Sequence, residues 1–267
     1  MPTQDIYLSV VIPAYNEERR IAKTIQRLRT YLSRQAYSYE IIVVIDGARD
    51  GTVRVVESLK SSIPNLRLID RKENRGKGYT VREGMLAAQG KIRLFTDADN
   101  STDIAYFANM RPFFDKGYEM VVATRNPRDA AGATQEVSQV WYKRILGIAG
   151  NLFIQIVAVR GIWDTQTGFK AFRNFAAEKI FSQTHIYRWG FDVEVLALAR
   201  ALRYKIGIIP IHWFNDSESH VKFLAYFQVL WETVKVRWYL ARGYYNLSKS
   251  EARSPKSETS PQFRTSL

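Results

Sequence analysis

Cysteine is absent from this sequence of 267 residues, and only three histidines are present. Without cysteine the chain forms neither disulfide bonds nor thiolate metal sites, and the redox state of its compartment cannot be read from composition. The histidines, His185, His212 and His220, are too scattered along the chain for a zinc site. We therefore expect His185 and His212 to be structural.

Long apolar runs are also missing. The longest weakly polar stretch, Ile145–Val159, contains Asn151 and Gln155 and falls short of the roughly 20 apolar residues that a membrane-spanning helix needs. The first residues, Met1–Asp5, are polar, and the apolar run Leu8–Ile12 is too short for a secretory signal. We expect a cytoplasmic chain that does not span a membrane and is peripheral at the cytoplasmic membrane face.

Acidic residues are outnumbered, with 26 Asp plus Glu against 39 Lys plus Arg and a formal net charge of +13. The excess favours anionic partners, and charge alone does not choose among nucleic acid, anionic lipid and phosphorylated substrates. No nucleic-acid-binding motif is present, so we expect no nucleic-acid partner. Walker A and complete dinucleotide fingerprints are missing too, which argues against a P-loop NTPase and a dehydrogenase.

The first half alternates apolar strand patterns with helical patterns, which is typical of parallel βαβ units in an α/β fold. The second half is less regular. Strands are expected over Leu8–Ile12, Glu40–Ile45, Leu66–Ile69, Ile92–Thr96, Met120–Ala123, Phe169–Phe172 and Ile206–Trp213. Helices are expected around Ile21–Leu32, over Thr52–Lys60, after Gly76 and Gly78, and over Ser138–Val159 and Asp192–Leu202.

The C-terminal part divides into two segments. Val221–Leu247 interleaves aromatic residues such as Phe227 and Trp231 with cations such as Lys235, which predicts an amphipathic basic helical region on an anionic membrane surface. Packing of these helices on the rest of the protein is an equally good interpretation of the pattern. Ser248–Leu267 is rich in Ser, Pro, Lys and Glu and is predicted to be disordered.

Acidic residues cluster where predicted strands end. Glu17 follows the first strand, Asp46 ends the second, and Asp97 and Asp99 follow the fourth. Ligands of open parallel sheets bind outside the carboxyl ends of the strands, so these side chains are expected in one crevice. Carboxylates together with substrate phosphates are the usual shell of Mg²⁺ in nucleotide enzymes, and Asp97 and Asp99 are the predicted metal ligands. The alternative is that these aspartates only cap a helix.

A basic turn, Arg75-Gly76-Lys77-Gly78, leads into a predicted helix. Its backbone N–H groups, the helix N-terminus and two cations suit a diphosphate. Taken alone, the sequence is that of an ordinary turn.

Six motifs follow one another in order along the chain. They are Val10-Val11-Ile12-Pro13-Ala14-Tyr15-Asn16-Glu17-Glu18, Ile45-Asp46-Gly47 with Asp50-Gly51-Thr52, Asn74-Arg75-Gly76-Lys77-Gly78, Asp97-Ala98-Asp99, Asp164-Thr165-Gln166-Thr167-Gly168-Phe169-Lys170 and Arg188-Trp189-Gly190-Phe191-Asp192-Val193-Glu194. Together they resemble the family 2 glycosyltransferases of the GT-A fold, and within them the dolichyl-phosphate β-glucosyltransferase-like group, from about Leu8 to Val221.

The resemblance implies a mostly parallel, Rossmann-like sheet with flanking helices in a catalytic domain over residues 1–220. This domain would have a nucleotide-sugar half (1–105) and an acceptor half (106–220). The membrane-surface region 221–247 and the tail 248–267 would follow it.

The resemblance also implies roles for single residues. It places Mg²⁺ or Mn²⁺ and the donor diphosphate at Asp97 and Asp99, the acceptor phosphate at Arg125 and Arg144, and the sugar near Gln166 and Asp192. The donor-binding residues that it implies are Pro13, Tyr15, Glu17, Asp46, Arg75, Lys77 and Asp97.

The chain departs from the family pattern at several points. Ile45-Asp46-Gly47-Ala48 stands where the family usually has Asp-Asp-Gly-Ser, so recognition of the base or ribose is expected to differ. His220 stands where a lysine is common, and the N-terminal membrane anchor of the eukaryotic relatives is not seen in this sequence.

The implied reaction is an inverting transfer of a hexose, with glucose from UDP-glucose as the first choice, to a polyprenyl or dolichyl phosphate at a membrane surface. Transfer of mannose from GDP-mannose and transfer to a glycan or small-molecule hydroxyl remain alternatives, and a hydroxyl acceptor would need a general base such as Asp192. A non-catalytic nucleotide-binding protein is the remaining alternative. The sequence does not determine the oligomeric state.

Overall fold

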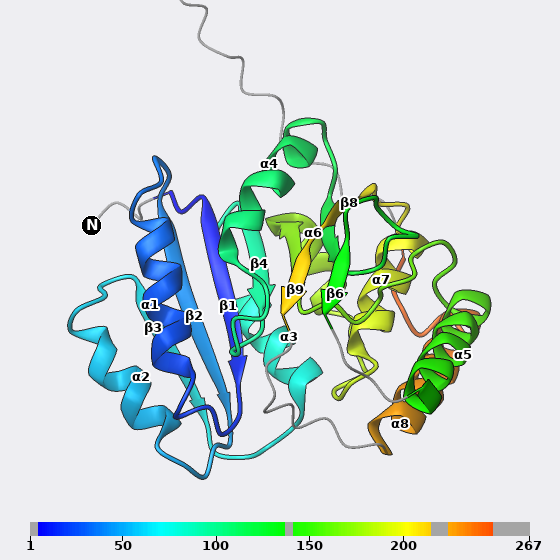
Figure 1. Cartoon of the computed structure of the whole chain (residues 1–267), viewed down its shortest axis with the longest axis horizontal. Coiled ribbons are helices and arrows are strands. Elements are labelled where there is room, and N and C mark those ends of the chain that lie inside the picture. The colour runs from blue at the N-terminus through cyan, green and yellow to red at the C-terminus, as the bar shows by residue number, and fades with distance from the viewer. Residues whose placement is uncertain (1–4, 137–140, 215–223, 248–267) are drawn as a thin grey trace, which may run out of the picture.

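The computed structural model describes residues 5–136, 141–214 and 224–247. Within them, seven strands form one sheet in the order β3-β2-β1-β4-β7-β5-β8 (Figure 1). Neighbouring strands are parallel except that β7 is antiparallel to both β4 and β5. The strands are β1 (Leu8–Ala14), β2 (Tyr39–Asp46), β3 (Leu66–Arg71), β4 (Ile92–Thr96), β5 (Met120–Thr124), β7 (Phe169–Arg173) and β8 (Ile206–Pro210).

Helices cover both faces of this sheet, and the alternation along β1 shows how. Val10 and Ile12 pack in one apolar cluster with Ile25 of α1, whereas Val11 packs in the other cluster with Met85 of α3. Strands buried on both faces are therefore continuous runs of Val, Ile and Leu. The helices are α1 (Ile21–Leu32), α2 (Thr52–Lys60), α3 (Lys77–Ala87), α4 (Phe107–Asp115), α5 (Trp141–Val157), α6 (Asn174–Phe181), α7 (Phe191–Ala201) and α8 (Leu224–Ala241), with a short 3-10 helix over Ile104–Tyr106.

The sequence-based prediction of the mostly parallel α/β sheet is confirmed, and one predicted element is wrong. Ile206–Trp213 is not one strand: it divides into β8 and β9 (His212–Phe214). Pro210, which has no backbone N–H to donate, ends β8, and the N–H of Ile211 donates to the carbonyl of Thr124 at 3.0 Å. The chain then leaves the main sheet, and β9 pairs with β6 (Thr134–Glu136) in a second sheet of two strands.

Helices α5 and α8 pack against each other, and α8 also packs on α7 (Figure 1). Helix α8 is not polar outside and apolar inside, because Glu232 and Thr233 are buried while Phe227, Trp231 and Trp238 are exposed. The predicted region Val221–Leu247 is thus helical over Leu224–Ala241, and residues 221–223 and the predicted tail 248–267 lie outside the described residues. None of the helices in the described residues has the length and apolar character to cross a bilayer.

Gly84 lets α3 approach the sheet closely, which gives a test of this packing. A Cβ at Gly84 would lie 2.4 Å from Val11 Cγ1 and 2.8 Å from Val44 Cγ2, whereas a Cβ at Gly147 in α5 meets nothing within 4 Å. We expect Gly84→Ala to lower the free energy of unfolding by about 1–3 kcal/mol through overpacking. Gly147→Ala, the matched control, should raise it by up to about 1 kcal/mol through helix propensity. Urea unfolding of both variants measures the difference, and equal shifts would contradict the close approach.

Candidate active site

The acidic residues predicted at strand ends do lie at one edge of the sheet. Strands β2, β1 and β4 are adjacent and parallel, Asp46 is the last residue of β2, and Asp97 and Asp99 directly follow β4. Glu17 follows β1 at the same edge. Tertiary structure thus brings these carboxylates from three separate segments of the chain to one site.

An ion pair between Lys77 and Asp97 is the centre of this edge. Lys77 is the first residue of α3, and its Nζ lies 2.6 Å from Asp97 Oδ1. Burial lowers the pKa of Lys77, but Asp97, Asp192 and Asp99 together more than reverse this, so the pKa is raised and the ammonium stays charged. A fixed cation beside carboxylates at an open strand edge suits an anionic group such as a diphosphate.

Asp97 is held from its other side by Gly168. A Cβ at Gly168 would lie only 1.9 Å from Asp97 Oδ2, so the carboxylate occupies the space that any larger residue would fill. Gly168 directly precedes β7, the strand antiparallel to β4. The absence of a side chain at Gly168 is therefore what leaves room for the Asp97 carboxylate at this position.

Asp46 fixes the glycine turn that carries Lys77. Its Oδ1 accepts the backbone N–H of Arg75 and its Oδ2 that of Gly76, each at 2.8 Å, and Arg71 Nη2 lies 3.3 Å from Oδ1. Gly76 has a φ of 99°, a conformation that favours glycine. The guanidinium of Arg75 donates to Tyr79 and Glu73. Asp46 therefore positions the turn, and its predicted contact with the nucleoside stays a prediction.

The remaining donor-side residues differ in exposure. Pro13 is buried in β1, whereas the Tyr15 side chain just after the strand is exposed. Glu17 pairs with Arg20 at 2.8 Å, and its backbone N–H donates to Thr52 Oγ1 at 2.8 Å. Tyr15 is thus the most accessible of the three for stacking on a base, and all three roles stay predictions.

A buried pair, Lys170 and Asp192, lies on the acceptor side. Asp192 is in the first turn of α7 and Lys170 is the second residue of β7, and Nζ and Oδ1 are 2.5 Å apart. Burial raises the pKa of Asp192 against the opposing effect of Lys170 and Lys77, and burial lowers the pKa of Lys170 against the opposing effect of Asp192. The sequence analysis gave Lys170 no role. The sequence feature that could have identified it is a lysine among the apolar residues of a predicted buried strand.

Arg125, predicted for the acceptor phosphate, is engaged by Asp164. Its Nε and Nη2 donate to the two carboxylate oxygens at 2.8 and 2.7 Å, and its backbone N–H donates to Oδ2. Burial acts to raise the pKa of Asp164, but Arg125 outweighs it and the pKa falls to about 2. Asp164 is a second residue that sequence reasoning left without a role. Arg144 lies in α5, and its side chain is outside the described residues.

Gln166 lies between these charged groups in the sequence and has an unused donor. Its Nε2 is buried and has no hydrogen-bond partner within the described part of the chain. Buried polar groups nearly always find a partner, so an unpaired amide in this segment points to a ligand oxygen. This agrees with its predicted place near the sugar, which stays a prediction.

The described residues contain no group of three or more His, Asp or Glu side chains that would hold a metal ion. Asp97 and Asp99 are both partly exposed at the strand edge, and Asp99 Oδ1 accepts the N–H of Ser101 at 2.9 Å. Two carboxylates fit a hard cation whose shell is completed by phosphate oxygens and water. The site therefore fits Mg²⁺ or Mn²⁺ bound jointly with a diphosphate.

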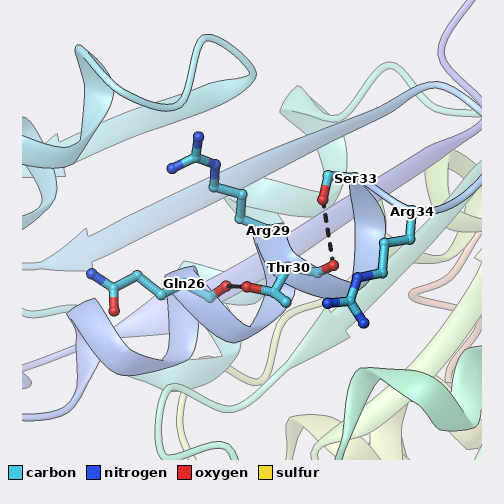
Figure 2. Close-up of a pocket in the computed structure, with 5 residues that line it drawn as sticks. All are labelled: Gln26, Arg29, Thr30, Ser33 and Arg34. Carbon is cyan, nitrogen blue, oxygen red and sulfur yellow. Dashed lines mark hydrogen bonds between the residues drawn. The ribbon is translucent and has the colours of Figure 1, made fainter.

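A separate surface depression lies along α1 (Figure 2). It is lined by Gln26, Arg29, Thr30, Ser33 and Arg34, and the drawn hydrogen bonds run from Thr30 Oγ1 to the carbonyl of Gln26 and from Ser33 Oγ to that of Thr30. These residues run from the middle of α1 to the turn after it, whereas the acidic strand edge lies at the start of that helix. The depression is not part of the candidate active site.

Comparison with known proteins agrees with this architecture. The family model for glycosyl transferase family 2 matches residues 9–181. A dolichyl-phosphate beta-glucosyltransferase of Dictyostelium discoideum is 32% identical over 256 residues, covering 92% of this chain and 78% of that protein. The structure of the present chain is similar to that of mannosyl-3-phosphoglycerate synthase from Rubrobacter xylanophilus, with a TM-score of 0.67, 15% identity and coverage of 97% of this chain and 80% of that one. It is also similar to glucosyl-3-phosphoglycerate synthase from Mycobacterium tuberculosis in complex with Mn²⁺, UDP-glucose and phosphoglyceric acid, with a TM-score of 0.64, 19% identity and coverage of 87% and 79%.

The contact between Gly168 and Asp97 gives a direct test of the site. A methyl group at Gly168 must displace the Asp97 carboxylate from its position beside Lys77. Disturbing a residue that positions a metal ligand typically weakens metal affinity on the order of 10–100-fold, so we expect Gly168→Ala to weaken binding of UDP with Mn²⁺ by about that factor. Isothermal titration calorimetry measures it, with Gly147→Ala as the matched control. Unchanged affinity in a folded Gly168→Ala protein would show that Asp97 does not hold the diphosphate complex.

Proposed function

Because the chain belongs to the family 2 glycosyltransferases, we propose that it transfers glucose from UDP-glucose to a polyprenyl phosphate of the dolichyl type, with inversion at the anomeric carbon. Support comes from the similarity to a dolichyl-phosphate beta-glucosyltransferase over 92% of the chain. The observation that carries the proposal is the charged pair of Lys77 and Asp97 beside Asp99 at the carboxyl edge of the sheet.

On the donor side, the protein stabilises the leaving diphosphate. The acceptor oxygen attacks the anomeric carbon in line with the departing UDP, so an α-linked donor gives a β-linked product. Negative charge grows on the diphosphate as the bond breaks, and Lys77, held by Asp97 at 2.6 Å, stands where it offsets this charge. Asp97 and Asp99 would hold Mg²⁺ or Mn²⁺, which supplies further positive charge to the diphosphate when bound. The Mn²⁺ complex of the mycobacterial enzyme supports this cofactor.

On the acceptor side, the contacts of Asp192 favour a phosphate over a hydroxyl. A hydroxyl acceptor needs a general base within reach, and Asp192, the candidate, is buried and bound to the Lys170 ammonium at 2.5 Å. A phosphate monoester is largely dianionic near pH 7, because its second pKa is about 6, and it attacks without a base. Arg125 is the candidate cation for binding the acceptor phosphate. Its guanidinium would then contact both the phosphate and Asp164. Transfer to a hydroxyl and use of GDP-mannose are the alternatives that an assay must exclude.

The acceptor lipid places the enzyme at a membrane, and we propose peripheral binding at the cytoplasmic face. Six large apolar side chains on the packed helices α8 and α5 are exposed, and Trp231, at 61%, is among the most exposed. Four of the six lie on α8 three or four residues apart, and therefore on one face of that helix. Patches of exposed apolar surface mark interaction sites, and nearby cations suit anionic lipid. The six residues are Leu152, Ile156, Phe227, Trp231, Val234 and Trp238.

The first test replaces charge at the donor site. We expect Asp97→Asn and Asp99→Asn each to lower kcat by at least about 100-fold, because each removes a carboxylate from the diphosphate and metal site. Asp103→Asn is the matched control, since Asp103 lies on the same stretch of chain and the hydrogen bond of its side chain is to the N–H of Ala105, away from the Lys77 and Asp97 pair. Radiolabelled transfer from UDP-glucose to dolichyl phosphate measures the rates, with GDP-mannose and the neutral polyprenol as alternative substrates. Transfer to the neutral alcohol at an equal rate would contradict the phosphate acceptor.

The second test concerns the membrane surface. We expect the double variant Phe227→Ser and Trp231→Ser to bind anionic vesicles on the order of tenfold or more weakly, because burying an aromatic side chain is worth about 1.5–3 kcal/mol. Wild-type binding should weaken as ionic strength rises. Point substitutions are preferable to truncation before α8, which would also remove the buried Glu232 and Val236.

The control for this test uses the arginines of the depression on α1. Helix α1 lies on the far side of the molecule from α5 and α8 (Figure 1), and Arg29 and Arg34 are exposed there (Figure 2). The double variant Arg29→Ser and Arg34→Ser should sediment with vesicles of phosphatidylserine and phosphatidylcholine almost as well as the wild type. If it loses binding as fully as the aromatic variant does, attraction is a general effect of net charge and α8 is not the docking surface.

A further inference from the structure

The segment Thr184–Gly190 lies directly on the turn that carries Lys77. The backbone N–H of Tyr79 donates to the carbonyl of Tyr187 at 3.2 Å, and the rings of these two residues meet edge to face with centroids 5.1 Å apart. A Cβ at Gly76 would lie 2.5 Å from that carbonyl oxygen, so the two backbones are in close contact. Lys77 Nζ lies 5.8 Å from the centre of the Trp189 ring. The position of this segment therefore affects the position of Lys77.

The end of the segment is fixed by a carboxylate of α8. Glu232 is buried, and its Oε2 accepts the backbone N–H of Gly190 at 2.6 Å, while its Oε1 accepts from Gln228 at 2.9 Å. A Cβ at Gly190 would lie 2.6 Å from Glu232 Cβ, so only glycine allows α8 to approach this closely. Gly190 caps α7, and Asp192 lies in the first turn of that helix.

The beginning of the segment is fixed by a second buried carboxylate, which also depends on the C-terminal part of the chain. Glu194 accepts the backbone N–H groups of His185 and Ile186 at 2.8 and 2.9 Å, and Tyr245, beyond α8, donates its hydroxyl to Glu194 at 2.7 Å. Burial raises the pKa of Glu194 to about 7, although these three donors favour its charged form. Both ends of the segment are thus held by contacts that involve residues 224–247.

We infer that α8 is part of the catalytic unit and that Glu232 is a positioning residue for glycosyl transfer, fixing the Thr184–Gly190 segment against the Lys77 turn. The predicted division at residue 220 between a catalytic domain and a surface region is then not a functional boundary. Within the described residues Glu232 accepts hydrogen bonds from Gly190 and Gln228, so its effect on the site would run through Gly190, Trp189 and the backbone of Tyr187. Because charge on the leaving diphosphate develops in the transition state, a displaced Lys77 lowers kcat more than it changes the KM for the donor.

The test compares variants that separate positioning from stability. Glu232→Ala removes the acceptor for the Gly190 N–H, and Glu232→Gln keeps an oxygen that can accept it. Thr233→Val is the matched control, because Thr233 is the adjacent buried polar residue of α8 and its hydroxyl donates only within the helix, to Val229 at 2.8 Å. If Glu232→Ala does not fold, Glu232→Asp replaces it, since its carboxylate is one methylene too short to reach Gly190.

Two reactions are measured for each variant, at a temperature well below the melting temperature of the least stable variant. The concentration of folded protein is determined by titrating its binding sites with UDP. The first is transfer from UDP-glucose to dolichyl phosphate. The second is hydrolysis of UDP-glucose without an acceptor, in which water replaces the acceptor and UDP leaves with its electron pair. This inference rests on the proposed function only for the first reaction. A wild-type protein that hydrolyses the donor but does not transfer glucose overturns the proposed acceptor and leaves Glu232 testable.

We expect Glu232→Ala to lower kcat per folded site at least tenfold relative to Thr233→Val in both reactions, with the KM for UDP-glucose changed less than threefold. Glu232→Gln should retain at least a third of the wild-type kcat. The inference is overturned if Glu232→Ala and Thr233→Val have equal kcat values per folded site. It is equally overturned if Glu232→Gln is as slow as Glu232→Ala, because the Gly190 hydrogen bond would then not be the relevant contact.

Discussion

The ion pair between Lys77 and Asp97 joins the two parts of the structure on which the proposed chemistry depends. Lys77 begins α3 and Asp97 follows β4, so neither residue alone defines the site. Asp46 holds the turn before Lys77 by accepting two backbone N–H groups. The Asp97 carboxylate fits beside residue 168 because that residue is a glycine. Donors and charges fixed in advance need no reorganisation as the diphosphate departs, which is how a rigid site lowers a barrier.

Charge on the acceptor side is paired rather than free. Lys170 is matched by Asp192 and Arg125 by Asp164, and all four are largely buried. A buried charge is costly unless it has a partner, so each of these residues is paired. Because Asp192 and Asp164 are occupied by these ion pairs, neither is free to act as a general base. This arrangement is better suited to an acceptor that brings its own negative charge than to one that must lose a proton. Arg125 and Asp192, for which the family resemblance implied acceptor-side roles, are thus paired with Asp164 and Lys170.

The sequence predicted much of the fold and the meeting of the strand-end acids at one edge of the sheet. Asp46, Asp97 and Asp99 were found because buried parallel strands are visible as apolar runs and ligand sites follow strand ends. Lys170 and Asp164 were not assigned roles, because pairing between β7 and its neighbours determines which charges meet. The single strand expected over Ile206–Trp213 was wrong because a strand's sheet membership depends on partners distant in the chain. The roles of Arg144 and of the residues from 248 onward remain untested predictions.

The sequence by itself determined the βαβ alternation, the family and the acids at the strand ends, because periodicity and short motifs are local properties of the chain. Only tertiary structure decided that Asp46 holds a turn, that Gly168 supports Asp97, and that Glu232 of α8 binds Gly190. These contacts join residues that are 30, 71 and 42 positions apart in the numbering. A carboxylate in a sequence has no stated partner, and its partner is fixed only when packing excludes water and brings a particular N–H within hydrogen-bond distance.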